Sequence, residues 1–118
     1  DAVRNVDGIE LDYSSASLVH IDRILLGFHE EGLSETQIGE TVFSLGCYAG
    51  EVFVRQAEAT WVAAEDVVAR QLLPEGAAFP LVQLPSGDAW NPITKAFKRL
   101  EAGETESLAY LYDAALSR

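Results

Sequence analysis

A chain of 118 residues, 48% of them hydrophobic, has the size and apolar content of one globular domain with one core, residues 1–118. Its 19 acidic and 8 basic side chains give a formal net charge of -11, which repels phosphate backbones and anionic membrane surfaces. The apolar runs are far shorter than the roughly 20 residues that span a bilayer. Nucleic acid and membranes are therefore not expected partners.

The chain has one cysteine, Cys47, so it cannot form an internal disulfide. Besides this thiol the chain offers only His20 and His29 as nitrogen or sulfur ligands for zinc, which is too few for a typical site. We therefore expect neither a metal nor a cofactor. The sequence does not begin with a basic segment followed by an apolar one, so the cytoplasm is the expected location.

The first helix is predicted to follow a weakly extended segment, Gly8–Tyr13, that alternates apolar and polar residues like a short edge strand. Ser14 has the character of its N-cap, and Gly32 ends it. Its apolar positions follow the spacing of one buried helical face: Leu18, Ile21, Ile24, Leu25 and Phe28. Both histidines then fall at the boundary or on the polar side.

The second helix has the clearest start signal in the chain. Ser34 and Gln37 are spaced as a capping box, and Leu33 and Ile38 as the hydrophobic staple around it. The helix is predicted to begin near Glu35, to run to about Ala57 and to be central. Two adjacent stripes are expected to be buried: Ile38, Val42, Leu45, Ala49 and Val52, and beside them Gly39, Phe43, Gly46, Gly50 and Phe53.

Three glycines on the second stripe favour close packing of a neighbouring element, because each weakens the helix by about 1 kcal/mol relative to alanine. A phosphate-binding loop would need its glycines before a helix, not within one. Cys47, beside this stripe, is expected to be a small, half-buried packing residue.

The opposite face of the same helix is expected to meet solvent or a partner. It carries Tyr48, Glu51 and Arg55 in line, and the last two have the favoured spacing and order of a helical ion pair. This face is the best candidate for recognition on the helix.

A small antiparallel sheet is predicted after Ala57. Phe79–Leu84 and Ala89–Asn91 read as a hairpin around a Pro85–Asp88 turn, and Thr60–Ala63 as a further strand. Pro80 favours an edge position for its strand. Residues 65–76 form a connection of variable structure.

Asn91 and Pro92 have the cap and first-turn residues of a third helix, which Gly103 ends, with Ile93, Ala96, Phe97 and Leu100 buried. Its other face gathers Lys95, Lys98 and Arg99. Either these cations meet the helix dipole at its C-terminal end, which we favour, or they form a patch that holds an anion. A last helix is predicted to begin in the acidic turn Glu104–Glu106.

Three segments, LGCYAGEVFVRQ, Trp61 and NPITKAFKRLEAG followed by SLAYLY, resemble a family of small bacterial proteins, a domain of unknown function, with motifs LGxYxGEVxxR, GGxW and NPxxKxxKRLxxGxxDSL. The resemblance covers residues 13–112 and implies an α+β single domain without adding an activity. It departs at Ala57–Ala59, where a glycine pair is expected, and at Glu106, where Asp is. The motif residues are Gly46, Tyr48, Gly50, Glu51, Arg55, Trp61, Asn91, Pro92, Lys95, Lys98, Arg99, Gly103 and Ser107.

The predicted fold is α+β, with about four helices around a long central helix and a small antiparallel sheet or hairpin. No arrangement that would activate a general base or nucleophile is visible in the sequence, which favours a non-catalytic protein. The leading hypothesis is an acidic protein-binding module, immunity-like or regulatory, that binds a basic protein, as a monomer or a homodimer.

The alternative is a small anionic-ligand-binding domain in which Arg55, Trp61, Trp90 and Lys95 converge between the second helix, the hairpin and the third helix. The full candidate surface comprises Tyr48, Glu51, Arg55, Trp61, Trp90, Asn91, Lys95, Lys98 and Arg99.

Overall fold

A computed structural model describes residues 5–6, 9–63 and 79–117, with side chains from Leu11 onward. Its helices are α1 (Ser17–Glu30), α2 (Glu35–Ala57), α4 (Pro92–Ala102), the 3-10 turn η1 (Gly103–Thr105) and α5 (Leu108–Leu116). Its strands are β1 (Asn5–Val6), β2 (Ile9–Glu10), β3 (Thr60–Val62), β4 (Leu81–Gln83) and β5 (Ala89–Trp90). This arrangement confirms the predicted α+β class. The connection predicted at residues 65–76 lies outside the described residues.

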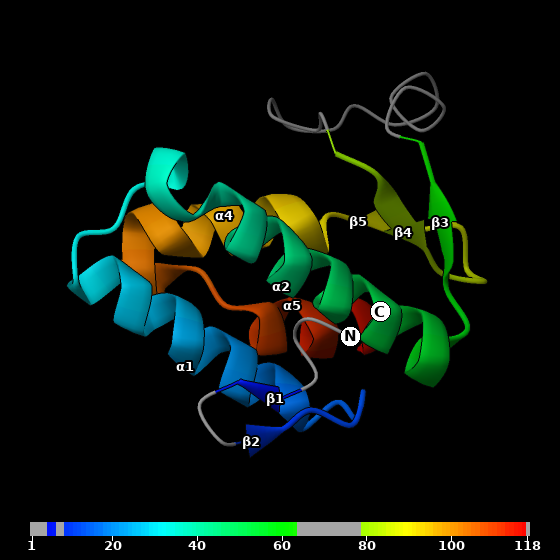
Figure 1. The fold of residues 1–118 in the computed structure, drawn as a ribbon. Coiled ribbons are helices and arrows are strands. Elements are labelled where there is room, and N and C mark those ends of the chain that lie inside the picture. Colours follow the sequence, from blue (N-terminus) through cyan, green and yellow to red (C-terminus); the bar gives the residue numbers. More distant parts are fainter. Residues whose placement is uncertain (1–4, 7–8, 64–78, 118) are drawn as a thin grey trace.

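Helix α2 crosses the middle of the molecule and packs most extensively against α4 (Figure 1). It also contacts α1, α5 and the strands β3 and β4, as a central helix should. The largest fully buried side chains come from the four helices, from β4 and from the segment before α1: Leu11, Leu18, Ile21, Leu25, Val42, Leu45, Val52, Phe53, Leu81, Ile93 and Leu108.

Helix α1 begins two residues later than the sequence predicted. Ala16, not Ser14, occupies its N-cap position. Ser14 instead lies in a turn in which its backbone N–H and its Oγ both donate to Asp12 Oδ1, at 3.0 and 2.6 Å. A side chain that is bound to the preceding carboxylate is not available to cap the helix, which explains the difference.

Helix α2 has the predicted bounds, and the Gln37 side chain accepts a hydrogen bond from Ser34 N at 2.9 Å, as in a capping box. Ile38 departs from helical geometry (φ -131°, ψ 23°), and Figure 1 shows the first turn set off from the rest of α2. The helix ends at Ala57, and its C-cap Glu58 has a left-handed φ of 60°. Glycine adopts this conformation without strain, and a glycine pair is what the family resemblance leads one to expect here.

The three-stranded sheet has the order β3-β4-β5, with both pairs antiparallel. The predicted hairpin and the further strand near Thr60 are thus confirmed. The edge position predicted from Pro80 is wrong, because β4 is the central strand. Pro80 immediately precedes β4, where its missing N–H interrupts no ladder hydrogen bond.

Helix α4 begins at Pro92 and ends at Gly103, as predicted. Asn91 occupies the N-cap position, and its backbone carbonyl accepts from Lys95 N at 2.9 Å, but its side chain makes no capping hydrogen bond. The last helix does not begin in the acidic turn. Gly103–Thr105 forms η1, and α5 starts only at Leu108, after Ser107 accepts from Tyr110 N at 3.1 Å.

No helix in the described ranges combines the length and apolar character that a bilayer-spanning segment needs.

Candidate functional site

Tyr48, predicted to face outward, is buried, and that part of the prediction is wrong. Its hydroxyl accepts a hydrogen bond from Tyr13 N at 2.7 Å and donates to Ser17 Oγ at 2.8 Å. The Tyr13 ring covers it, with ring centroids 4.5 Å apart. A tyrosine can be buried at little cost when its hydroxyl is satisfied in this way. Tyr48 therefore ties the segment before α1 to α2.

Glu51 and Arg55 do lie at the surface of α2, and they form the predicted ion pair at 3.5 Å. Each also has a second partner from another element. The Arg55 guanidinium lies 3.9 Å from the centroid of the Tyr13 ring, and Glu51 Oε2 accepts from Trp61 Nε1 at 3.0 Å. This half-exposed group joins α2 to β3 and to the segment before α1.

The glycines of α2 divide into two kinds. A Cβ on Gly46 would lie 2.7 Å from Ile93 Cα of α4, and a Cβ on Gly50 would lie 2.1 Å from Trp61 Cη2. These two positions confirm the predicted close packing. Gly39 does not: a Cβ there would meet no atom within 4 Å. Phe43, one turn on and also predicted to be buried, is 40% exposed.

Arg99 was predicted on the outer face of its helix, and it is instead 7% exposed. Its Nε donates to the Asp22 carbonyl at 2.7 Å, while Nη1 donates to the carbonyls of Gly103 and Glu106. The Asp22 carboxylate lies 3.6 Å from Nε. Carbonyl and carboxylate partners on several elements explain why a guanidinium can be buried here.

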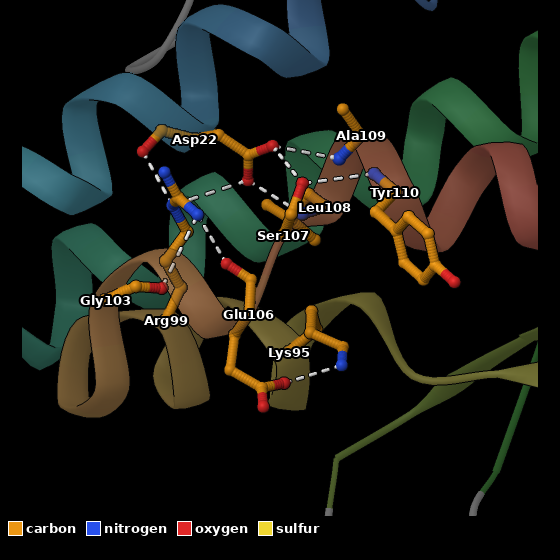
Figure 2. A network of polar contacts seen from close by, with 9 residues as sticks. All are labelled: Asp22, Lys95, Arg99, Gly103, Glu106, Ser107, Leu108, Ala109 and Tyr110. Carbon is orange, nitrogen blue, oxygen red and sulfur yellow. Dashed lines mark hydrogen bonds and ion pairs between the residues drawn. The ribbon is translucent and has the colours of Figure 1, made fainter.

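Figure 2 shows where the Asp22 carboxylate points: at the first turn of α5. Its oxygens accept from Leu108 N at 2.7 Å, Ala109 N at 3.0 Å and Ser107 Oγ at 2.7 Å. A helix N-terminus favours a negative charge because its first N–H groups have no partner within the helix. The site that could bind an anion, an arginine beside a helix N-terminus, is filled by the protein's own carboxylate.

Lys95, also in Figure 2, is half-buried and pairs with Glu106 Oε1 at 2.6 Å. Lys98 is half-buried as well. Of the three predicted patch cations, two are thus bound to groups of the same chain. Arg99 also donates to a carbonyl just past the end of α4, as cations near a helix C-terminus do.

Trp61 and Trp90 are brought to one face of the sheet. Both are Cα partners of Val82, on the neighbouring central strand, and residues opposite one another across strands share a face. Both indoles pack partly buried against the core. They therefore support the sheet on the helices rather than project from it.

An open groove lies between the first half of α2, Phe79 just before β4, and α4. Its volume is about 530 Å³. Its apolar wall is a ladder of Phe43, Phe79 and Phe97, with centroids 5.8 and 5.3 Å apart. It is lined by Glu35, Gly39, Glu40, Phe43, Ser44, Phe79 and Phe97. We call this feature the phenylalanine groove.

The groove was missed at the sequence level because Gly39 and Phe43 fall on a stripe with helical core spacing. Ile38 departs from helical geometry, and among the residues that the structure describes no atom packs against Gly39. The available signal was the pair Glu35 and Glu40, five residues apart, which places negative charge beside that stripe.

Cys47 is partly buried, as expected, and burial together with the nearby Glu51 carboxylate raises the pKa of its thiol. His29 is partly buried and donates from Nδ1 to the Leu100 carbonyl at 2.9 Å. Across the ranges that the structure describes, no three His, Cys, Asp or Glu side chains gather as a metal site would require.

Comparison with known proteins returned no matching family model, no matching curated protein and no matching solved structure.

Proposed function

We propose that this chain is a non-catalytic, acidic protein-binding module of the immunity-like or regulatory type, acting in the cytoplasm on a basic protein. Membership of the small bacterial family with the LGxYxGEVxxR and NPxxKxxKRLxxG motifs is part of the same proposal. The observation that carries it is the distribution of charge.

The chain carries 19 acids against 8 bases. Arg55, Lys95 and Arg99 are each engaged by a carboxylate of the same chain. Glu35, Glu40, Glu101 and Glu104 are exposed, so their negative charge faces solvent. Complementary charge steers association and disfavours partners of like sign, which points to a basic partner.

The alternative, a domain for small anionic ligands, depends on cationic side chains that are already paired within the chain. Arg55 and Lys95 are held by different glutamates, Glu51 and Glu106. Arg99 is buried against Asp22, whose carboxylate already occupies the N-terminus of α5. An added anion would have to displace an internal carboxylate that makes short hydrogen bonds. The arrangement therefore favours the protein-binding proposal.

The test is a pull-down from a lysate of the source organism with the full chain as bait, over a series of salt concentrations. A basic protein should be recovered, and its retention should fall roughly tenfold or more between about 0.05 M and about 0.5 M salt. Recovery that does not change with salt, or recovery of acidic proteins only, would contradict the proposal.

A parallel thermal-shift series with anionic metabolites addresses the alternative. Stabilisation by an anion that disappears in Lys95→Ala or Arg55→Ala would favour the ligand-binding domain instead.

A further inference from the structure

We infer that the phenylalanine groove is the docking site for the basic partner, and that its occupant is a short cationic segment carrying a large apolar anchor. This inference rests on the proposed function, because it names the site and the chemistry of that partner.

The apolar wall of the groove fits an apolar anchor. Phe79 and Phe97 stack with an interplanar angle of 7°, and Phe43 tilts against Phe79 at 54°. Phe43 is 40% exposed although it lies in the longest helix. A contiguous group of aromatic rings beside an open volume of about 530 Å³ is typical of a recognition surface.

The charged residues of the groove select the sign of the ligand. Glu35 and Glu40 are exposed and line it, and its described lining includes no lysine or arginine. An anionic ligand would meet these carboxylates as well as the overall charge of -11. Lysine or arginine residues flanking an apolar anchor would instead pair with both glutamates, so charge complementarity identifies a cationic segment.

Gly39 gives an independent reason to regard the groove as kept open. Within the described part of the chain, no atom lies within 4 Å of a Cβ placed on Gly39. Glycine inside a helix costs about 1 kcal/mol relative to alanine, and no neighbour in contact with Gly39 requires it. A ligand that fills the space above Gly39 would explain why this position has no side chain.

The experiment begins with a phage-displayed library of random short peptides, panned on the full chain. Peptides enriched on the wild type should combine lysine or arginine with an aromatic residue or leucine. Their affinity should fall at least about tenfold in Phe43→Ala and in Gly39→Leu. In Glu35→Gln/Glu40→Gln the affinity should fall several-fold and the salt dependence should decrease.

Gly27→Leu is the matched control, because Gly27 also lies within a helix, α1, and a Cβ there would also meet no atom within 4 Å. It should leave peptide affinity within about twofold of the wild type, since it lies outside the groove residues. Circular dichroism of each variant shows that it is folded.

Three results would overturn the inference: no enrichment of basic apolar peptides, equal binding to Phe43→Ala, or equal loss in Gly27→Leu. A concentration-dependent dimer that Phe43→Ala abolishes would also overturn it, because the groove would then hold a second copy of this chain.

Failure here is distinguishable from failure of the proposed function. If Phe43→Ala still captures the same basic protein from lysate with the same salt dependence, the acidic module stands and its docking site lies elsewhere. If neither the wild type nor the variant captures a basic protein, the proposed function fails as well.

Discussion

Arg99 Nε lies 2.7 Å from the Asp22 carbonyl and 3.6 Å from the Asp22 carboxylate, which joins two residues 77 positions apart in the chain. The same carboxylate receives the N–H groups of Leu108 and Ala109 at the start of α5. Asp22 therefore fixes three helices relative to one another: α1, on which it lies, α4 through Arg99, and α5 through its first turn.

Asp22→Ala should lower the free energy of unfolding by about 3–5 kcal/mol, because it leaves a buried guanidinium without its carboxylate and uncaps α5. Chemical denaturation measures the change. Glu101→Ala is the control, since Glu101 is an exposed acid on α4 and should change stability by no more than about 0.5 kcal/mol. Equal effects of the two substitutions would show that the network does not stabilise the fold.

Tyr48→Phe should destabilise the protein by about 1–2 kcal/mol. Removal of the hydroxyl leaves Tyr13 N without its acceptor and Ser17 Oγ without its donor in a partly buried site. The matched substitution Tyr110→Phe removes a hydroxyl from a side chain that is 73% exposed and should be nearly neutral. Thermal unfolding of both variants checks the prediction. If Tyr48→Phe does not change stability, the Tyr48 side chain faces outward, as the sequence suggested.

Gly46→Ala should destabilise the protein by about 1–3 kcal/mol, because its Cβ would lie 2.7 Å from a backbone atom, Ile93 Cα, which cannot move without shifting α4. Gly27→Ala should stabilise it by about 0.5–1 kcal/mol, because the added methyl meets no neighbour and favours the helix. Unfolding midpoints of the two variants should therefore move in opposite directions. Shifts of the same sign would contradict the packing of α2 against α4.

Cys47 should be a slow nucleophile in the folded protein. Burial first, and then the Glu51 carboxylate, raise the pKa of its thiol, so less thiolate is present at neutral pH than in the unfolded chain. Alkylation by iodoacetamide should be slower in the native protein than in urea, and its rate should level off at a higher pH in the native protein than in the unfolded chain. Since the folded-state pKa is the higher one, stability from this group is complete below the unfolded pKa and is lost as pH rises through the folded one.

The elements were predictable because their signals are local. The capping box of Ser34 and Gln37, the Asn91-Pro92 start and the Gly103 stop each depend on neighbours a few residues away. The same holds for the hairpin turn. The starts of α1 and α5 were missed, since Ser14 is bound by Asp12 and α5 is capped across the fold by Asp22.

The candidate surface was less predictable, because helical spacing shows which side chains share a face but not which partners lie opposite. Tyr48 and Arg99 have polar groups that spacing assigns to solvent, yet distant residues bind both. Gly39 and Phe43 have the spacing of a core stripe, yet no atom of the described residues lies within 4 Å of a Cβ at Gly39. Tertiary contacts of this kind override local pattern.

The motif residues behind the family resemblance acquire a common explanation from these contacts. Gly46 and Gly50 admit α4 and Trp61, while Glu51 and Arg55 bind groups before α1 and on β3. Ser107 binds Asp22 beside Arg99. Each of these residues therefore has a packing or hydrogen-bonding role in the fold.

The most direct test of the proposed docking is to map amide chemical shifts of the isotope-labelled full chain during titration with a selected basic apolar peptide. We predict that the largest chemical-shift changes occur at Gly39, Glu40, Phe43 and Phe97. The signals of the Trp61 indole and of the backbone amides around Arg55 and Lys98 should remain unchanged. Changes centred on Arg55, Trp61 and Lys98, with the groove signals unmoved, would contradict the account.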